Sequence, residues 1–109
     1  MSKKDVILTS RKEHIGIITL NKPEQRNTFD IPFAQKLNDA LRAFESDPQV
    51  RVIVIQAAGK HFSTGIALDE FKDKSHKEYR QFLHLMDEHN HTIARMKKIV
   101  IASVQGYAV

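Results

Sequence analysis

The sequence predicts an α/β protein in which a mostly parallel sheet is covered by helices. Two runs rich in β-branched residues, 50–56 and 99–104, have the composition of buried strands. Two other segments carry apolar residues at helical spacing. The expected order is strand, strand, helix, strand, helix, strand. Such alternation favours parallel pairing of the strands that the helices connect.

The first two strands are predicted at residues 6–9 and 15–21, joined by a polar turn at residues 10–14. Because side chains alternate along a strand, Ile18 and Leu20 share one face of the second strand.

A loop is expected at residues 22–27, because Pro23 cannot continue a central strand. The first helix is predicted to begin near Asp30, a favourable N-cap, with Pro32 in its first turn. Pro48 should end this helix. Its apolar stripe contains Phe33, Leu37, Ala40, Leu41 and Phe44.

The strand at residues 50–56 is almost continuously apolar, so both of its faces are expected to be covered. Ser75 and Glu78 form a capping-box pattern that predicts the start of the second helix. The helix is predicted to end near three cations, because positive charge is favourable at the negative end of a helix dipole. These cations are Arg95, Lys97 and Lys98. The expected apolar stripe contains Tyr79, Phe82, Leu83, Met86 and Ile93.

Composition limits the classes of function. The 109 residues suit one domain, residues 1–109, with a net charge of +4 and no cysteine. The basic residues are scattered, so the charge does not predict nucleic-acid binding. No apolar stretch approaches the roughly 20 residues of a membrane span, and no secretory signal is expected at the start. A cytoplasmic protein without membrane or nucleic-acid partners is the expectation.

Familiar catalytic and metal-binding patterns are missing from the sequence. It contains no dinucleotide fingerprint, phosphate-binding loop or nucleophile elbow. Six histidines occur without the spacing of a ligand set, so no metal site is predicted. Asp87 and Glu88 are adjacent on the second helix and are interpreted as part of a solvated face.

The stretch at residues 59–71 follows the third strand and contains a small-residue turn at residues 62–65. Gly65 would let a ligand approach the main chain, whose N–H groups could stabilise an oxyanion. A plain structural turn explains the same composition. The residues alone leave both interpretations open.

Three stretches of the sequence, residues 17–27, 50–71 and 98–108, resemble the enoyl-CoA hydratase/isomerase (crotonase) family in order and spacing. They are similar to the family's first strand with its "LNRP…N" loop, to "VRVVVLTGAGKAFSAGADLKEF" and to "KPVIAAVNGYA". The resemblance covers nearly the whole chain. It implies the start of a right-handed ββα spiral, incomplete within residues 1–109.

The resemblance also implies a function, the binding of acyl-CoA thioesters whose oxygen becomes an enolate, with a place in fatty acid metabolism. The backbone N–H of Ile66 would be one oxyanion donor. The substrate would contact Thr64, Gly65, Ile66, Ala67 and Leu68. Gln25 and Arg26 correspond to contacts on the nucleotide side of CoA, although a plain loop explains these two side chains as well. CoA would enter only as part of the substrate, with no separate cofactor.

The sequence departs from the family at several positions. Ala67 replaces the customary aspartate of "GAD", and Asp69 stands where lysine is frequent, which leaves the exact substrate open. The second oxyanion donor and the catalytic glutamates of the family would follow the last residue, Val109. Two readings stand: the N-terminal part of a hydratase or isomerase that assembles as trimers or hexamers, or a non-catalytic remnant that binds CoA or a partner subunit.

Overall fold

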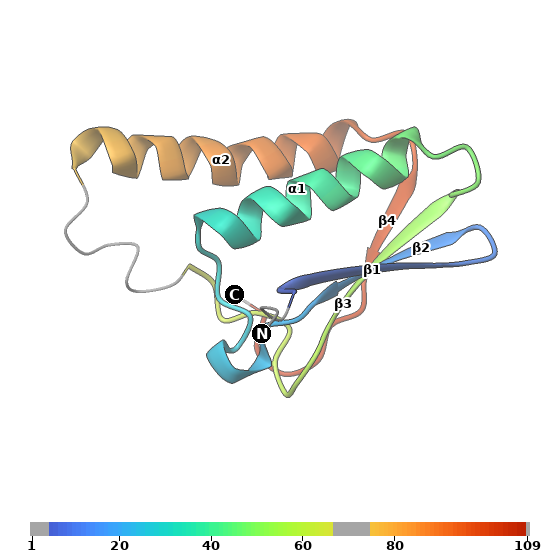
Figure 1. The fold of residues 1–109 in the computed structure, drawn as a ribbon, viewed down its shortest axis with the longest axis horizontal. Helices are drawn as coiled ribbons and strands as arrows, with labels where there is room; N and C mark the ends of the chain where they lie inside the picture. Colours follow the sequence, from blue (N-terminus) through green and yellow to red (C-terminus); the bar gives the residue numbers. More distant parts are fainter. Residues whose placement is uncertain (1–4, 67–74, 109) are drawn as a thin grey trace.

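The computed structural model describes residues 5–66 and 75–108. Its elements are β1 (Ile7–Lys12), β2 (Ile15–Leu20), the short 3-10 helix η1 (Pro23–Gln25), α1 (Ile31–Ser46), β3 (Val52–Ala57), α2 (His76–Arg95) and β4 (Ile99–Ala102). The predicted α/β class and order of elements are confirmed. Figure 1 shows both helices on one side of the sheet, with α2 alongside α1.

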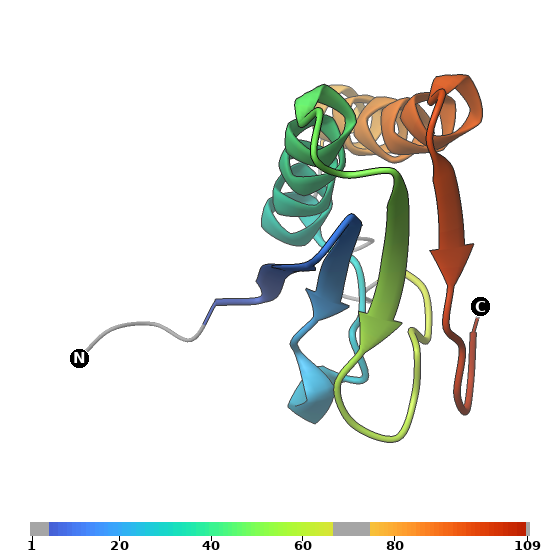
Figure 2. The same ribbon diagram turned by 90° about the vertical axis from the view of Figure 1, so that its right-hand side faces the viewer.

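The sheet has the strand order β1-β2-β3-β4. β1 and β2 form an antiparallel hairpin, whereas β2, β3 and β4 pair in parallel. Each parallel connection runs through a helix, as the sequence predicted. Figure 2 shows β4 at one edge, beneath the end of α2.

β1 is longer than predicted. It runs to Lys12, and the turn that was expected at residues 10–14 contains only Glu13 and His14, with Glu13 at a φ of 55°. The register pairs Lys12 with Ile15, so hydrogen bonding to β2 extends a strand whose own residues are polar.

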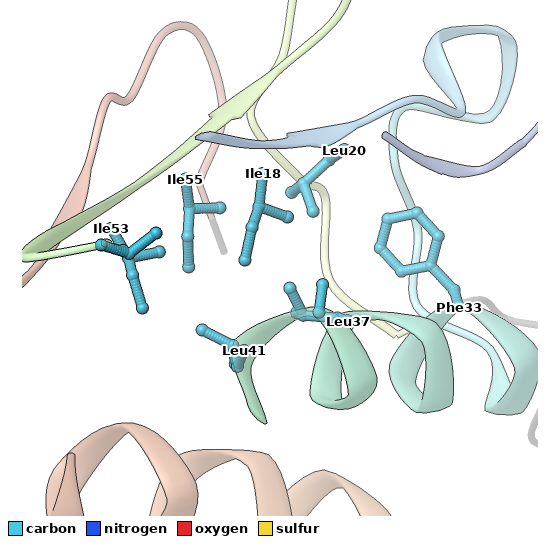
Figure 3. Packing of buried hydrophobic residues seen from close by; sticks show 9 residues of the cluster. Ile18, Leu20, Phe33, Leu37, Leu41, Ile53 and Ile55 are labelled. Atoms are coloured by element: carbon cyan, nitrogen blue, oxygen red, sulfur yellow. The ribbon is translucent and has the colours of Figure 1, made fainter. Parts of the chain in front are cut away.

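The core lies between the sheet and α1 (Figure 3). Ile18 and Leu20 of β2 share a face, as the alternation predicted, and both point toward α1. The buried cluster contains Ile18, Leu20, Phe33, Leu37, Ala40, Leu41, Val50, Ile53 and Ile55. Burial of this apolar surface is the main favourable contribution to folding.

Both helix starts are confirmed by their caps. The Asp30 carboxylate accepts a hydrogen bond from the N–H of Phe33 at 2.9 Å, and the Ser75 hydroxyl accepts one from the N–H of Glu78 at 3.1 Å. α1 ends before Asp47, whose backbone is extended because Pro48 follows it.

The prediction of the apolar stripe on α2 is partly wrong. Phe82 is buried, but Leu83 remains 46% exposed because it lies a quarter turn away from the contact with α1. Glu88 was expected on a solvated face of α2, but it forms an ion pair with Arg42 of α1. Lys98 donates to the carbonyl oxygens of Phe44 and Asp47, so it caps α1 instead of α2.

The described residues leave the outer face of the sheet partly uncovered, and the prediction that β3 is covered on both faces is not confirmed, since Val52 and Val54 are only half-buried. The register places Ile99 beside Val52 and Ile101 beside Val54, opposite the core. Ile99 is 63% and Ile101 48% exposed. β3 therefore has β-branched residues on both faces: one face packs in the core, and the other belongs to an apolar outer surface of the sheet.

Candidate functional site

Three loops meet at the carboxyl ends of β2, β3 and β4. Parallel strands bring their carboxyl ends to one edge of a sheet, where ligands of α/β proteins bind. The N–H of Phe29 donates to Gly65 at 2.8 Å and that of Thr64 to Arg26 at 3.2 Å, which joins the first loop to the second. The N–H of Ser63 donates to Tyr107 at 3.1 Å, which joins the second loop to the third.

Asn27 holds the first two loops together. It is fully buried, and its Oδ1 accepts a hydrogen bond from the Lys22 N–H at 2.7 Å. Its Nδ2 donates to the carbonyl oxygens of Ala58 and His61, each at 3.0 Å. Asn27 has a φ of 54°, a left-handed conformation in which asparagine is enriched. Both its side chain and its backbone preference suit this position.

The turn after β3 is fixed by Ser63. Its buried hydroxyl donates to the carbonyl oxygen of Asn27 at 2.9 Å and accepts from the Gly65 N–H at 3.1 Å. Gly65 has a φ of 92°, which side chains with a Cβ rarely adopt. The glycine is thus required by the backbone conformation. Its N–H is held by Ser63 and its carbonyl oxygen by Phe29, directly before Ile66.

The loop after β4 packs against the same turn. Gln105 donates to the carbonyl oxygen of Ala57 at 2.7 Å. The Tyr107 N–H donates to Nδ1 of His61 at 3.1 Å, and the two rings stack with centroids 4.7 Å apart. Gly106 has a φ of 59°, and a Cβ there would lie 2.2 Å from the carbonyl oxygen of Lys60. This close approach requires glycine.

A cavity of about 390 Å³ opens beside the turn. It is lined by Phe29, Phe62, Ser63, Gly65, Ile66, Met86, Asn90 and Ala108. The parallel bridge between Phe29 and Ile66 uses the carbonyl oxygen of Gly65, and no hydrogen bond among the described residues takes the Ile66 N–H. Ile66 therefore combines a place in the wall of a largely apolar cavity with a main-chain N–H that bonds to no described residue.

The predicted site residues fall into three groups. Gly65 and Ile66 line the cavity, and Thr64 lies next to them in the same turn. Gln25 and Arg26 lie in and directly after η1, exposed to solvent, and do not line it. The predictions for Ala67, Leu68 and Asp69 lie outside the described residues.

Sequence reasoning missed several contributors to the site. Asn27 and Ser63 organise the loops, and Met86 and Asn90 supply the α2 wall of the cavity. The signal for the last two was their spacing of four residues, which places them on one face of a helix. Lys22, in the loop expected at residues 22–27, is buried and paired with Asp30 at 3.3 Å.

Residues 5–66 and 75–108 hold no group of three histidine or acidic side chains placed to share a metal ion. The helices in that part of the chain are too short or too polar to cross a bilayer. His91 Nε2 lies 3.4 Å from a carboxylate oxygen of Asp87, one turn earlier in α2.

The fold and the site define an α/β protein with a main-chain-lined cavity at the carboxyl ends of its parallel strands. Residues 10–109 match the enoyl-CoA hydratase/isomerase family. The mitochondrial enoyl-CoA hydratase of Pongo abelii is 35% identical over 94 residues, which cover 86% of this chain and 32% of that protein. The crotonyl-CoA hydratase of Syntrophomonas wolfei is 29% identical over 110 residues, covering 100% of this chain and 42% of that protein.

Solved structures of enoyl-CoA hydratases share the fold of this chain. The crystal structure of enoyl-CoA hydratase from Bacillus halodurans superposes with a TM-score of 0.88 at 27% identity, covering 95% of this chain and 43% of that one. The chain belongs to the enoyl-CoA hydratase/isomerase family. It spans less than half the length of the relatives named here.

Proposed function

We propose that this chain binds acyl-CoA thioesters and that the Ile66 N–H donates a hydrogen bond to the thioester carbonyl oxygen. The observation that carries the proposal is the uncommitted N–H of Ile66 in the wall of the cavity of about 390 Å³. The names of the relatives, enoyl-CoA hydratase and crotonyl-CoA hydratase, suggest the substrate class.

The proposed contact would strengthen during reaction. When water adds to the enoyl group, or when a proton leaves the carbon beside the carbonyl group, negative charge develops on the thioester oxygen. A main-chain donor held in place beforehand stabilises that charge without reorganisation. The bonds that Ser63 makes with Asn27 and Gly65 provide this rigidity. Loss of such a donor costs roughly 3 kcal/mol in known enzymes.

We propose that Gln25 and Arg26 contact the nucleotide part of CoA. Both side chains are exposed and lie on the loop that is tied to the oxyanion turn through Thr64. The Arg26 guanidinium can pair with phosphate oxygens, for which its planar donor geometry is well suited. Lys22 does not take this role in the proposal, because its ammonium group pairs with Asp30.

Catalysis needs a further group. Proton transfer in this chemistry calls for a positioned acid or base, and no carboxylate is among the described residues that line the cavity. The alternative proposal is therefore a non-catalytic module that binds CoA or a partner subunit. The exposed Ile99 and Ile101 favour the subunit contact. Assembly as trimers or hexamers and a cytoplasmic location belong to the proposal as well.

The test is calorimetric titration of the 109-residue chain with crotonyl-CoA, followed by infrared spectroscopy with an isotopically labelled thioester carbonyl. We expect saturable binding and a carbonyl band at lower frequency in the complex, because a hydrogen bond weakens the C=O bond. Free CoA should bind without this spectral change. Binding of crotonyl-CoA with an unshifted carbonyl band would exclude Ile66 as the donor.

A further inference from the structure

The cavity at Ile66 meets a second one along α2. The second cavity measures about 540 Å³ and is lined by Arg80, Leu83, His84, Met86, Asp87 and Asn90. Met86 and Asn90 line both cavities. A chain that leaves the Ile66 N–H along the first cavity would therefore pass these two side chains before it enters the second.

The two cavities differ in polarity. Phe29, Phe62 and Met86 make the first cavity largely apolar. Its polar side chains among the described residues are those of Ser63 and Asn90, and the Ser63 hydroxyl both donates to Asn27 and accepts from Gly65. Beyond Asn90 the second cavity presents Arg80, His84 and Asp87, which are polar.

Asn90 stands at the boundary with an uncommitted amide. The side-chain amide makes no hydrogen bond to any residue in the described part of the chain, and Asn90 is exposed to solvent. An amide offers donors and an acceptor together. Any apolar chain that covered Asn90 would remove this amide from water without replacing its hydrogen bonds, which is unfavourable.

We propose that Asn90 determines acyl-chain specificity and that the substrate class is an acyl thioester with a hydrogen-bonding group at the distal end of its chain. This inference rests on the proposed function, since the thioester must be held at Ile66. The part of the chain near the thioester is apolar and packs on Phe62 and Met86. The distal hydroxyl group, or a group of similar chemistry, hydrogen-bonds with the Asn90 amide.

The expected selectivity follows from the net value of a hydrogen bond. A neutral pair contributes about 0.5–1.5 kcal/mol, which corresponds to a change in dissociation constant of roughly two- to tenfold. The preference should be seen at the chain length that reaches Asn90 and should fade for chains too short to reach it.

The experiment measures dissociation constants of the 109-residue chain for butanoyl-, hexanoyl- and octanoyl-CoA and for their ω-hydroxy counterparts. Asn90→Leu removes the amide, and Asn90→Asp keeps an acceptor for the hydroxyl proton. Gln81→Leu is the matched control, because Gln81 is an exposed amide on α2 that lines neither cavity. Comparing the two members of each pair cancels any effect of the variants on binding of the CoA part.

We expect the wild-type chain and Gln81→Leu to prefer the ω-hydroxy ligand at one length by two- to tenfold. Asn90→Leu should prefer the alkyl ligand, and Asn90→Asp should restore the preference for the hydroxyl group. Equal binding of both members at every length, or an unchanged preference in Asn90→Leu, would overturn the role of Asn90. If the wild-type chain binds none of the acyl-CoAs, the proposed function itself fails.

Discussion

At the scale of single residues, the site depends on polar groups that are buried and fully used. Asn27 joins two loops through three side-chain hydrogen bonds, and Ser63 uses its hydroxyl as donor and acceptor. Buried polar groups of this kind specify one loop arrangement, because every alternative leaves a donor or acceptor without a partner. A main-chain donor such as the Ile66 N–H can be held in place only by such a frame.

We expect Asn27→Ala to lower the free energy of unfolding by about 2–4 kcal/mol, since it leaves buried N–H and C=O groups unpaired and places alanine at a positive φ. Urea denaturation measures this loss. Asn90→Ala, at an exposed amide without described partners, should change stability by less than about 0.5 kcal/mol. Equal effects of the two substitutions would contradict the role given to Asn27.

Gly106 allows the third loop to approach the second. We expect Gly106→Ala to weaken binding of crotonyl-CoA and to lower the melting temperature, because a Cβ would clash with the carbonyl oxygen of Lys60 and displace Ala108 from the cavity wall. Calorimetry and thermal unfolding measure both effects. Ala43→Gly, on the exposed face of α1, is the control and should cost only about 1 kcal/mol of stability without changing affinity. Unchanged affinity in Gly106→Ala would separate the third loop from the site.

At the scale of helices and strands, the sequence predicts what local chemistry decides. The caps at Asp30 and Ser75 and the face of Ile18 and Leu20 follow from hydrogen bonding and alternation within a few residues. The end of β1 does not follow from local chemistry, since Lys12 is part of a strand only because it pairs with Ile15 of β2. Contacts between distant elements decide such features.

The candidate site divides in the same way. The turn at Gly65 could be predicted, because a small-residue turn after a buried strand is a local pattern. Its resemblance to a family supplied the role of Ile66, which stays a prediction. The spacing of Met86 and Asn90 places them on one helix face. That this face and Ala108 border the turn could not be predicted, since it depends on how α2 and the last loop pack there.

Lys98 shows how a distant contact can be tested. Its ammonium group donates to the carbonyl oxygens of Phe44 at 2.5 Å and Asp47 at 2.6 Å, at the end of α1. We expect Lys98→Met to lower the free energy of unfolding by about 1–2 kcal/mol, because carbonyl groups at a helix end lose a cationic donor. Lys97→Met removes an exposed ammonium group that bonds to no described residue and should have little effect. Equal stability of both variants in urea would contradict the capping role.

At the scale of the whole molecule, the described residues form two layers, a sheet and a pair of helices. No described element covers the outer face of the sheet. The outer face of the sheet carries Ile15, Ile99 and Ile101, all exposed, and β4 lies at the edge of the sheet. Apolar faces and unpaired strand edges of this kind favour association. The chain spans 43% of the Bacillus halodurans enzyme, so more than half of that structure has no counterpart here.

We expect the 109-residue chain to self-associate with increasing concentration, through the outer face of β4. Sedimentation velocity at several concentrations should show a shift to larger species, and Ile101→Lys should suppress it by placing a charge on the apolar face. Gln81→Lys adds the same charge on exposed α2 and should leave association unchanged. A wild-type chain that stays monomeric throughout and unfolds cooperatively would refute this expectation.

We expect the 109-residue chain to hydrate crotonyl-CoA no faster than the uncatalysed reaction, even where it binds the thioester. One donor in an open cavity competes with water, where a hydrogen bond contributes about 1 kcal/mol net. The described cavity wall holds no carboxylate to move a proton, and the absence of a general acid or base costs roughly another 10²–10⁴-fold. The assay follows the loss of enoyl absorbance, with a full-length enoyl-CoA hydratase as the positive control. Turnover by the purified chain, abolished by Gly65→Val at the oxyanion turn, would show that a catalytic carboxylate acts from outside the described wall.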